Sequence, residues 1–326
     1  MKTKISIREV AERAGVSTAT VSRVLNKSLY VRPELEEKVI RASRELGYVP
    51  NRLARGLRIG SSGMIGFLIP DIVNPFFSEI VKGAEDYLRE KGYFIFLASS
   101  SGDSLKEEEL LKALYSRNIE GIGAIILGEL PEFVRSISSN LPIVIIDNYQ
   151  DWDEVSYVFS DNYGGMKKMM NYLIRGGHKS FAFLNGPANT FSSRERLRAF
   201  EDVISEENRS FEIHFGDYTF ESGRDMLRRL KRIPDAIVCG NDMIAFGAIM
   251  ELTEMKYDVP GRVSVTGFDD ILFSSMTNPK LTTVRQDGYA MGRVSGEILL
   301  RKISGQKTNH KILLKTSLQI RGSSNG

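Results

Sequence analysis

The sequence predicts an α/β protein in which a small all-α helix-turn-helix DNA-binding domain precedes a two-lobed body of doubly wound parallel sheets. Two observations carry this prediction. Residues 6–26 combine a helix-start signal with a central glycine, as two short helices around a tight turn require. From Met64 onward, short apolar runs alternate with amphipathic stretches, which is typical of buried parallel strands joined by helices.

The first helix is predicted to begin at a capping box, in which Ser6 is followed three residues later by Glu9. Gly15 can adopt the left-handed conformation that ends a helix, and Ser17 is a favourable N-cap for a second one. Pro33 is pre-set for the first turn of a third helix. Two short helices around a glycine turn place the second in the major groove of duplex DNA, so we expect this unit to bind DNA.

Charge is distributed unevenly along the 326 residues. Residues 1–60 hold 13 Lys and Arg against 6 Asp and Glu, whereas the remainder holds 31 against 35. A basic head on a mildly acidic body favours polyanion binding by the head. The chain is 42% hydrophobic, which is enough for more than one core.

Several classes of protein are disfavoured by the composition. No apolar run approaches the length of a membrane span, and the N-terminus lacks a secretory-signal pattern, so we expect a cytoplasmic protein. The single Cys239 cannot form an internal disulfide, and three scattered histidines do not favour zinc. We therefore expect no metal and no cofactor. Dinucleotide and Walker motifs are missing from the sequence, and no catalytic residue is assigned.

Four stretches near the N-terminus occur in a recognisable order and spacing. They are the string from Ser6 to Asn26, Val31-Arg32-Pro33-Glu34, Leu46-Gly47-Tyr48-Val49-Pro50-Asn51 and Ala54-Arg55-Gly56-Leu57. In this order and spacing they resemble the LacI family of transcription regulators. The resemblance implies a DNA-binding domain at residues 1–50 and a hinge helix or linker at 51–61. The hinge helix of that family folds on DNA and inserts an apolar wedge into the minor groove, a role that falls on Leu57.

Positions in the second helix acquire roles from the same resemblance. Thr18, Ala19 and Arg23 match positions that read bases, and an arginine can donate two hydrogen bonds to a guanine edge. The short polar side chains suit phosphate contacts, although Thr20 and Ser22 could instead lie on the helix surface or cap it. The expected DNA-binding set is Ser17, Thr18, Ala19, Thr20, Ser22, Arg23, Asn26, Asn51, Arg55 and Leu57.

The body resembles the type I periplasmic-binding-protein fold, which the family shares with sugar-binding proteins. In that fold the chain crosses between the lobes three times, and we place these crossings near Asp161, Gly288 and Gly322. The N-terminal lobe then holds residues 62–160 and 289–322, and the C-terminal lobe holds residues 161–288. The expected strands are 64–69, 93–98, 124–127 and 143–146 in the first lobe, and 180–184, 211–215, 236–239 and 264–268 in the second.

Ligands in such folds bind beyond the carboxyl ends of the strands, where this chain places polar and aromatic residues. Carboxylates, amides and guanidinium groups can pair with sugar hydroxyls, while aromatic rings can pack on a sugar ring. The resemblance implies that these positions bind the effector, and Asn74 and Gln286 match ribose-type binders. Asn148 departs from the pattern, because those binders often have Arg there. The expected effector-binding set is Asn74, Phe76, Phe77, Asp147, Arg194, Tyr218, Asn241, Asp269 and Gln286.

Structural roles for some nearby side chains stay open. One of Phe76 and Phe77 could belong to the core, and Asp242 could cap the following helix. Arg196 is assigned to the surface or to a contact between lobes.

The favoured function is a homodimeric repressor of a carbohydrate-utilisation operon, acting on a pseudo-palindromic DNA operator. Its operator affinity would be controlled by a small monosaccharide, with a pentose such as ribose preferred. Apolar faces at Ile80, Ala84 and Leu88, and along residues 291–303, could form the dimer interface or pack against the sheet.

Three alternatives remain. The first keeps this architecture with a purine or another co-repressor as the effector. The second is a solute-binding protein. The third is an enzyme, since cleft carboxylates could hydrolyse a glycoside, but the mixed set of polar and aromatic residues suits binding better.

Overall fold

The computed structural model describes residues 5–26, 30–48, 61–207 and 209–326. The chain divides into two compact units, Met1–Ser62 and Gly63–Gly326, each of which is considered by itself. Within the described ranges, no helix has the length and apolar character needed to cross a membrane.

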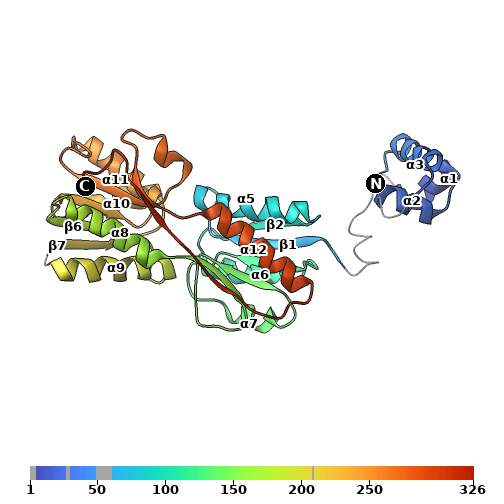
Figure 1. The fold of residues 1–326 in the computed structure, drawn as a ribbon, viewed down its shortest axis with the longest axis horizontal. Helices are drawn as coiled ribbons and strands as arrows, with labels where there is room; N and C mark the ends of the chain where they lie inside the picture. The colour runs from blue at the N-terminus through green and yellow to red at the C-terminus, as the bar shows by residue number, and fades with distance from the viewer. Residues whose placement is uncertain (1–4, 27–29, 49–60, 208) are drawn as a thin grey trace. The chain divides into compact units, whose positions relative to one another are not determined.

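The described residues of the first unit form three helices (Figure 1). The predicted capping box is confirmed, since the Ser6 hydroxyl accepts from the Glu9 backbone N–H and the Glu9 carboxylate accepts from the Ser6 backbone N–H. Gly15 has φ 67° and ψ 36°, the left-handed conformation that was expected to end the first helix. The helices are α1 Ile7–Ala14, α2 Thr18–Asn26 and α3 Pro33–Leu46. Their shared core contains Val10, Ala11, Ala14, Val21, Val24, Val39 and Ala42.

The body contains two six-stranded sheets, as expected for a two-lobed α/β fold. All neighbouring strands are parallel except β12, which runs antiparallel to β10. The N-terminal sheet has the order β11 Lys311–Leu314, β5 Ser156–Ser160, β4 Ile143–Ile146, β3 Gly121–Ala124, β1 Met64–Ile69 and β2 Phe94–Ser99. The C-terminal sheet has the order β12 Ser317–Gln319, β10 Thr282–Arg285, β9 Ser264–Asp269, β8 Ala236–Cys239, β6 Ser180–Asn185 and β7 Ser210–Phe215.

Helices cover both faces of each sheet, so alternate strand residues belong to different cores (Figure 1). In β1, Phe67 packs with α5 and α12 on one face, while Leu68 packs with α6 and α7 on the other. The helices of the N-terminal lobe are α5 Pro75–Glu90, α6 Ser104–Tyr115, α7 Glu132–Ser138 and α12 Gly288–Ile303. Those of the C-terminal lobe are α8 Asn162–Arg175, α9 Phe191–Glu207, α10 Phe220–Arg228, α11 Asp242–Glu254 and the short 3₁₀ helix η1 Leu272–Ser275.

Helices α5 and α12 pack closely, which corrects one expectation about the dimer. A Cβ atom added at Gly292 would lie 1.9 Å from the Ile80 carbonyl oxygen, so the two backbones nearly touch. Ile80, Ala84 and Leu88 are fully buried in the N-terminal core. Their apolar face therefore packs within the chain and is not available to a second subunit.

The chain crosses between the lobes near two of the three predicted positions. It passes from β5 to α8 at Asp161 and from β10 to α12 just before Gly288. The third crossing occurs between β11 and β12, and not at Gly322 as predicted. The reason is that β12 pairs with β10 of the C-terminal sheet, so the final residues belong to that lobe.

The strand predictions need correction in two respects. Strands β5, β10, β11 and β12 were not predicted, although all four belong to the two sheets. Strand β3 ends at Ala124, so the apolar run at residues 125–127 continues beyond the paired segment. Ile125 and Ile126 are fully buried, which explains why their composition looked like that of a strand.

Candidate functional site

The second helix of the head displays most of the residues that were predicted to bind DNA. Thr18, Ala19 and Arg23 are exposed, whereas Val21 and Val24 on the opposite face are buried. The Ser17 hydroxyl accepts from the Thr20 backbone N–H at 3.1 Å and lies 3.0 Å from the Thr20 hydroxyl. In this structure Ser17 therefore acts as the helix N-cap, a role that leaves its exposed side able to meet a phosphate.

Part of the predicted DNA-binding set cannot be placed. Asn51, Arg55 and Leu57 lie outside the described residues, and so does the side chain of Asn26. Ser22 is half-buried in α2.

The body holds a narrow cavity of about 10 Å³ between its lobes, at the carboxyl ends of the strands. The N-terminal lobe contributes residues that follow β1, β3 and β4, and the C-terminal lobe contributes residues of α9 and those that follow β7, β8 and β9. This position agrees with the rule for doubly wound sheets. The lining residues are Asn74, Phe76, Phe77, Leu127, Asp147, Ser192, Arg196, Tyr218, Asn241 and Asp269.

Two buried carboxylates, Asp147 from the N-terminal lobe and Asp269 from the C-terminal lobe, line the cavity. Burial raises the pKa of Asp147 to about 6, although the nearby Arg196 opposes this shift. Burial also raises the pKa of Asp269 well above its ordinary value, with Arg196 again opposing. Both residues have positive φ values, 56° and 118°, which are unusual for non-glycine residues and are often found at functional sites.

Gln286 supports the cavity from behind Asp269. Its side-chain N–H donates to Asp269 Oδ1 at 2.7 Å, while its own Oε1 is buried without a hydrogen-bond partner among the described residues. Asp147 Oδ1 is likewise buried and unpartnered there. Buried acceptors are costly unless a donor reaches them, so these oxygens favour a ligand that is rich in hydroxyl or N–H donors.

Arg196, and not Arg194, is the cation of the cavity. Its guanidinium donates to Asn162 Oδ1 and to the Gly240 carbonyl oxygen, stacks 3.8 Å over the Phe268 ring, and lies 3.9 Å from Asp269 Oδ1. Of the two roles predicted for Arg196, a surface position is wrong, because only 2% of the residue is exposed, whereas a position between the lobes agrees with its place in the cavity lining.

Arg194 has a different role from the one predicted. Its side chain is exposed and donates to the Asn189 carbonyl oxygen at 2.7 Å, outside the lining of the cavity. The physical reason is the helical repeat of α9. Ser192 and Arg196 are four residues apart and share one face, whereas Arg194 is rotated by about 200° from Ser192.

The predicted aromatic residues all line the cavity. Phe76 and Phe77 also belong to the N-terminal core, with ring centroids 5.7 Å apart, so both have a structural role as well. The Tyr218 hydroxyl lies 3.0 Å from the Ser192 hydroxyl, and a Cβ atom at Gly186 would collide with the Tyr218 ring at 2.1 Å. Glycine is thus required there for the tyrosine to reach the cavity.

The asparagines of the cavity combine capping with lining. Asn74 accepts from the Phe76 N–H as the N-cap of α5, and Asn241 accepts from the Ile244 N–H as the N-cap of α11. Asp242 does not cap the helix as suggested. It is fully buried and accepts from the Ile271 N–H and from the Ser274 and Thr283 hydroxyls, which makes it a structural residue.

Three residues that line the cavity were not among the predicted effector-binding residues. Ser192 and Arg196 belong to a stretch that was already expected near the cavity. Because they are four residues apart in one helix, their spacing predicts that they share a face. Leu127 follows β3 and carries no polar signal in the sequence.

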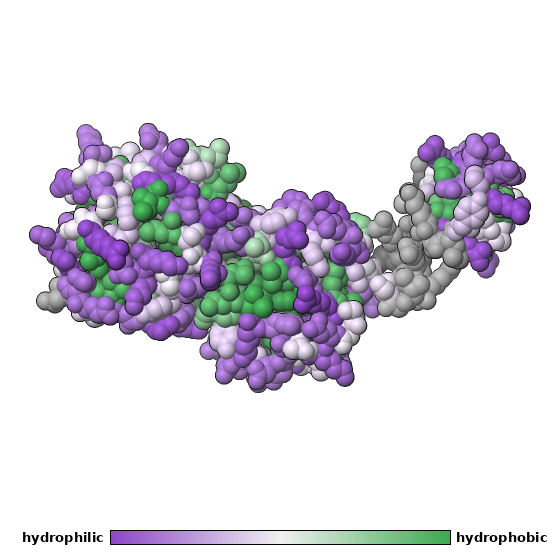
Figure 2. Space-filling model, in the orientation of Figure 1, coloured by the Kyte–Doolittle hydropathy of each residue, from purple (hydrophilic) through white to green (hydrophobic). Residues whose placement is uncertain are grey.

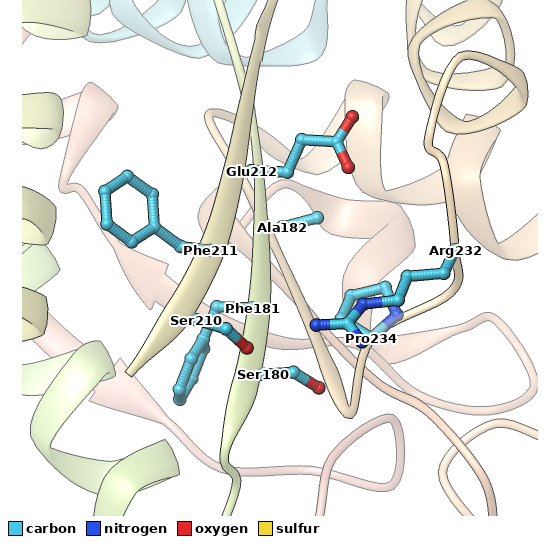
Figure 3. Close-up of a pocket in the computed structure, with 8 residues that line it drawn as sticks. All are labelled: Ser180, Phe181, Ala182, Ser210, Phe211, Glu212, Arg232 and Pro234. Atoms are coloured by element: carbon cyan, nitrogen blue, oxygen red, sulfur yellow. The ribbon is translucent and has the colours of Figure 1, made fainter. Parts of the chain in front are cut away.

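A second groove, of about 60 Å³, lies at the amino ends of β6 and β7, the end of that sheet opposite the interlobe cavity. Figure 3 shows Arg232 reaching toward the two strands while the Phe211 ring points away from it. None of the predicted site residues lines this groove, so we assign it no part in effector binding.

Comparison with known families supports the two-unit organisation. The family described as bacterial regulatory proteins, lacI family, matches residues 6–51. A second family, described as a periplasmic binding protein-like domain, matches residues 170–324.

Curated relatives match nearly the whole chain. The ribose operon repressor of Halalkalibacterium halodurans is 33% identical over 325 residues, which cover 98% of this chain and 97% of the relative. The HTH-type transcriptional repressor PurR of Aliivibrio fischeri is 31% identical over 318 residues, which cover 94% of each. Among solved structures, the lac repressor dimer bound to operator and the anti-inducer ONPF has a TM-score of 0.87 and 27% identity, covering 99% of this chain and 100% of that one.

Proposed function

This chain belongs to the LacI family of transcriptional repressors, and on that premise we propose that it is a homodimer controlling a carbohydrate operon in response to a monosaccharide. The preferred effector is a pentose such as ribose. The observation that carries the proposal is the interlobe cavity, in which Asp147 keeps a buried acceptor oxygen that has no hydrogen-bond partner among the described residues.

The chemistry of the cavity suits a small neutral polyol. Each sugar hydroxyl can donate one hydrogen bond and accept others, which matches acceptors such as Asp147 and Asp269 and donors such as Arg196. A phosphate or carboxylate group on the ligand would be repelled by the acidic side chains of Asp147 and Asp269. We therefore expect an uncharged sugar.

The name of the ribose operon repressor at 33% identity supports ribose as the effector. A purine is the second candidate, because a purine repressor is 31% identical and aromatic side chains could stack on a planar base. Isothermal titration of the full-length protein with D-ribose, other pentoses, hexoses, hypoxanthine and guanine separates the two. A heat of binding with the purines, and none with any of the sugars, would exclude the sugar proposal.

Operator control is tested with DNA duplexes that the protein itself selects from a random-sequence pool. We expect the selected duplexes to be pseudo-palindromic, because two heads on a two-fold axis read two half-sites. The bound sugar should change operator affinity, and the change defines the coupling between the sites. A ligand that binds without altering operator affinity would refute the regulatory role.

Exposed apolar side chains support the homodimer. Figure 2 shows a mainly hydrophilic surface on the body with a hydrophobic area over the N-terminal lobe. Ile72, Val73, Leu272, Phe273 and Met276 are all at least half exposed, and such groups often mark interaction surfaces. Light scattering coupled to size exclusion should give twice the 36.6 kDa mass of one chain.

A further inference from the structure

Strand β7 forms one edge of the C-terminal sheet (Figure 1). Among the described strands it pairs only with β6, so one row of its backbone N–H and C=O groups faces outward. Strands β2, β11 and β12 are the other sheet edges, and of these four strands β7 alone contains both a carboxylate and an imidazole side chain. An unpaired edge is a template to which another strand can add.

The side chains of β7 are arranged symmetrically about Ile213. Phe211 and Phe215 lie two residues before and after it, while Glu212 and His214 flank it directly. Because side chains alternate along a strand, the three apolar residues share one face of the sheet and the two polar residues share the other. Figure 3 shows the Phe211 ring and the Glu212 carboxylate on opposite sides of β7. A second copy of this strand, running antiparallel, would therefore place each kind of side chain opposite a suitable partner.

Both faces of β7 leave side chains accessible at the edge. Phe211 is 49% exposed and Phe215 is 40% exposed, although phenylalanine is usually buried. On the other face, the side chains of Glu212 and His214 are 27% and 18% exposed, and His214 Nε2 lies 2.6 Å from Glu212 Oε1. A partner strand would thus contact two exposed rings on one face and a carboxylate beside an imidazole on the other.

The register with β6 shows which backbone groups of β7 face outward. Just past the strand, the Gly216 backbone N–H donates to the Asn185 carbonyl oxygen of β6 at 3.1 Å. Successive residues of a strand direct their backbone groups to opposite sides, so the other even-numbered residues of β7 also bond toward β6. Phe211, Ile213 and Phe215 therefore direct their N–H and C=O groups to the free edge.

We propose that β7 is a self-association surface, through which two copies of this chain join their C-terminal sheets as an antiparallel strand pair centred on Ile213. In that register each Phe211 lies opposite the partner's Phe215, and the outward residues form about six hydrogen bonds between the strands. Each Glu212 lies opposite the partner's His214 at a position without ladder hydrogen bonds, where opposed side chains come closest.

This contact is separate from the functions proposed above. It uses none of the exposed apolar residues that support the homodimer, and it requires no effector, so it joins two homodimers. The ladder spans only residues 211–215 of each strand, and a contact of this size is weak. We therefore expect it at high protein concentration, and we expect it to dissociate as the protein is diluted during size exclusion.

The register is tested by disulfide cross-linking of the full-length protein at high concentration. Phe211→Cys and Phe215→Cys each replace an exposed side chain, and the native Cys239 is buried, so the wild type serves as the blank. We expect linked chains of twice the mass only when the two variants are mixed, because positions 211 and 215 are opposed. In either variant alone the thiol-bearing residues would be more than about 13 Å apart, too far for a disulfide. No linked chains in the mixture, or an equal yield from one variant alone, overturns the proposal.

The opposed polar pairs are tested by sedimentation of the full-length protein at increasing concentration. His214→Glu places like charges opposite each other at both pairs, so we expect association to weaken about tenfold. Combining it with Glu212→His exchanges the two side chains and restores the opposition, so the double variant should associate as the wild type does. Gln306→Glu is the matched control, because it adds the same charge to an exposed residue outside β7 and should have no effect. Equal association of His214→Glu and the control, or an equal loss in the double variant, overturns the proposal.

Discussion

The side-chain N–H of Gln286 donates a hydrogen bond to Asp269 Oδ1 at 2.7 Å. This bond joins the second crossover between the lobes to the end of β9 at the cavity. Both side chains are buried, and Asp269 has the positive φ of 118°. A ligand that contacts Asp269 or the unpartnered Gln286 Oε1 therefore acts on the connection between the lobes. Such a differential contact is what a ligand needs in order to shift a conformational equilibrium.

Arg196→Met should abolish the effector response and destabilise the body. The substitution leaves Asp269 and Asn162 without their buried cationic partner, and breaking a buried pair costs about 3–5 kcal/mol. Urea unfolding gives the loss of stability, and D-ribose titration gives the loss of binding. Arg194→Ala is the matched control: its side chain is exposed, so we expect a change below about 1 kcal/mol and an intact response. Equal losses in both variants would contradict the assignment of Arg196.

Asp147→Asn should make the protein more stable at neutral pH while weakening effector binding. The pKa of Asp147 is raised from 3.8 to about 6 in the folded state, so the folded protein binds more protons than the unfolded chain between these values. The contribution of Asp147 to the free energy of unfolding is therefore greatest below about pH 4 and decreases as the pH rises to about 6. Two pKa units correspond to about 3 kcal/mol.

Urea unfolding of wild type and Asp147→Asn at pH 4 and pH 8 checks this sign. The stabilisation by the asparagine should be small at the acidic pH and approach its full value at pH 8. A gain that is larger at pH 4 would mean that Asp147 is stabilised in its charged form.

Gly292→Ala should strongly destabilise the N-terminal lobe. The added methyl group would lie 1.9 Å from the Ile80 carbonyl oxygen and 2.8 Å from the Ala84 nitrogen, both of which are backbone atoms that cannot rotate away. We expect a loss of at least about 3 kcal/mol, the upper end for overpacking. Gly296→Ala provides the comparison, because its Cβ would meet side-chain atoms of Leu88 and Tyr87 at 3.3 Å. Similar unfolding free energies for the two variants would show that α5 and α12 are not in such close contact.

Arg23→Ala should weaken operator binding in a sequence-dependent way. Arg23 is exposed on α2, where a bidentate contact to guanine is worth about 1–3 kcal/mol. Fluorescence anisotropy with single-base-pair variants of the selected duplex should show that specificity relaxes at one position in each half-site. A uniform loss across all duplexes, with a shallower salt dependence, would assign Arg23 to a phosphate.

The elements of the head followed from the sequence because their determinants are local. The capping box joins Ser6 to Glu9 and the helix end depends on the backbone freedom of Gly15, so neither needs a distant partner. The carboxyl-end positions of Asp147, Asn241 and Asp269 were also predictable, since parallel strands deliver their ends to the same edge of a sheet.

Strand β5 and the third crossing could not be located in the same way. Strand β5 was missed, and β12 joins the C-terminal sheet through pairing with β10, a contact between distant residues that leaves no mark in local composition. The apolar faces of α5 and α12 gave no indication of whether they would meet each other or a second subunit. The close approach at Gly292 decides that question in favour of packing within the chain.

The sequence by itself thus determined the class of fold, the helix boundaries of the head and the strand ends that supply the cavity. Only the tertiary structure decided that Arg196 enters the cavity while Arg194 turns outward. The physical reason is that composition and periodicity record which residues are apolar or charged along one element. The direction in which a side chain is buried depends on which surface that element packs against, and this is set by partners far away in the chain.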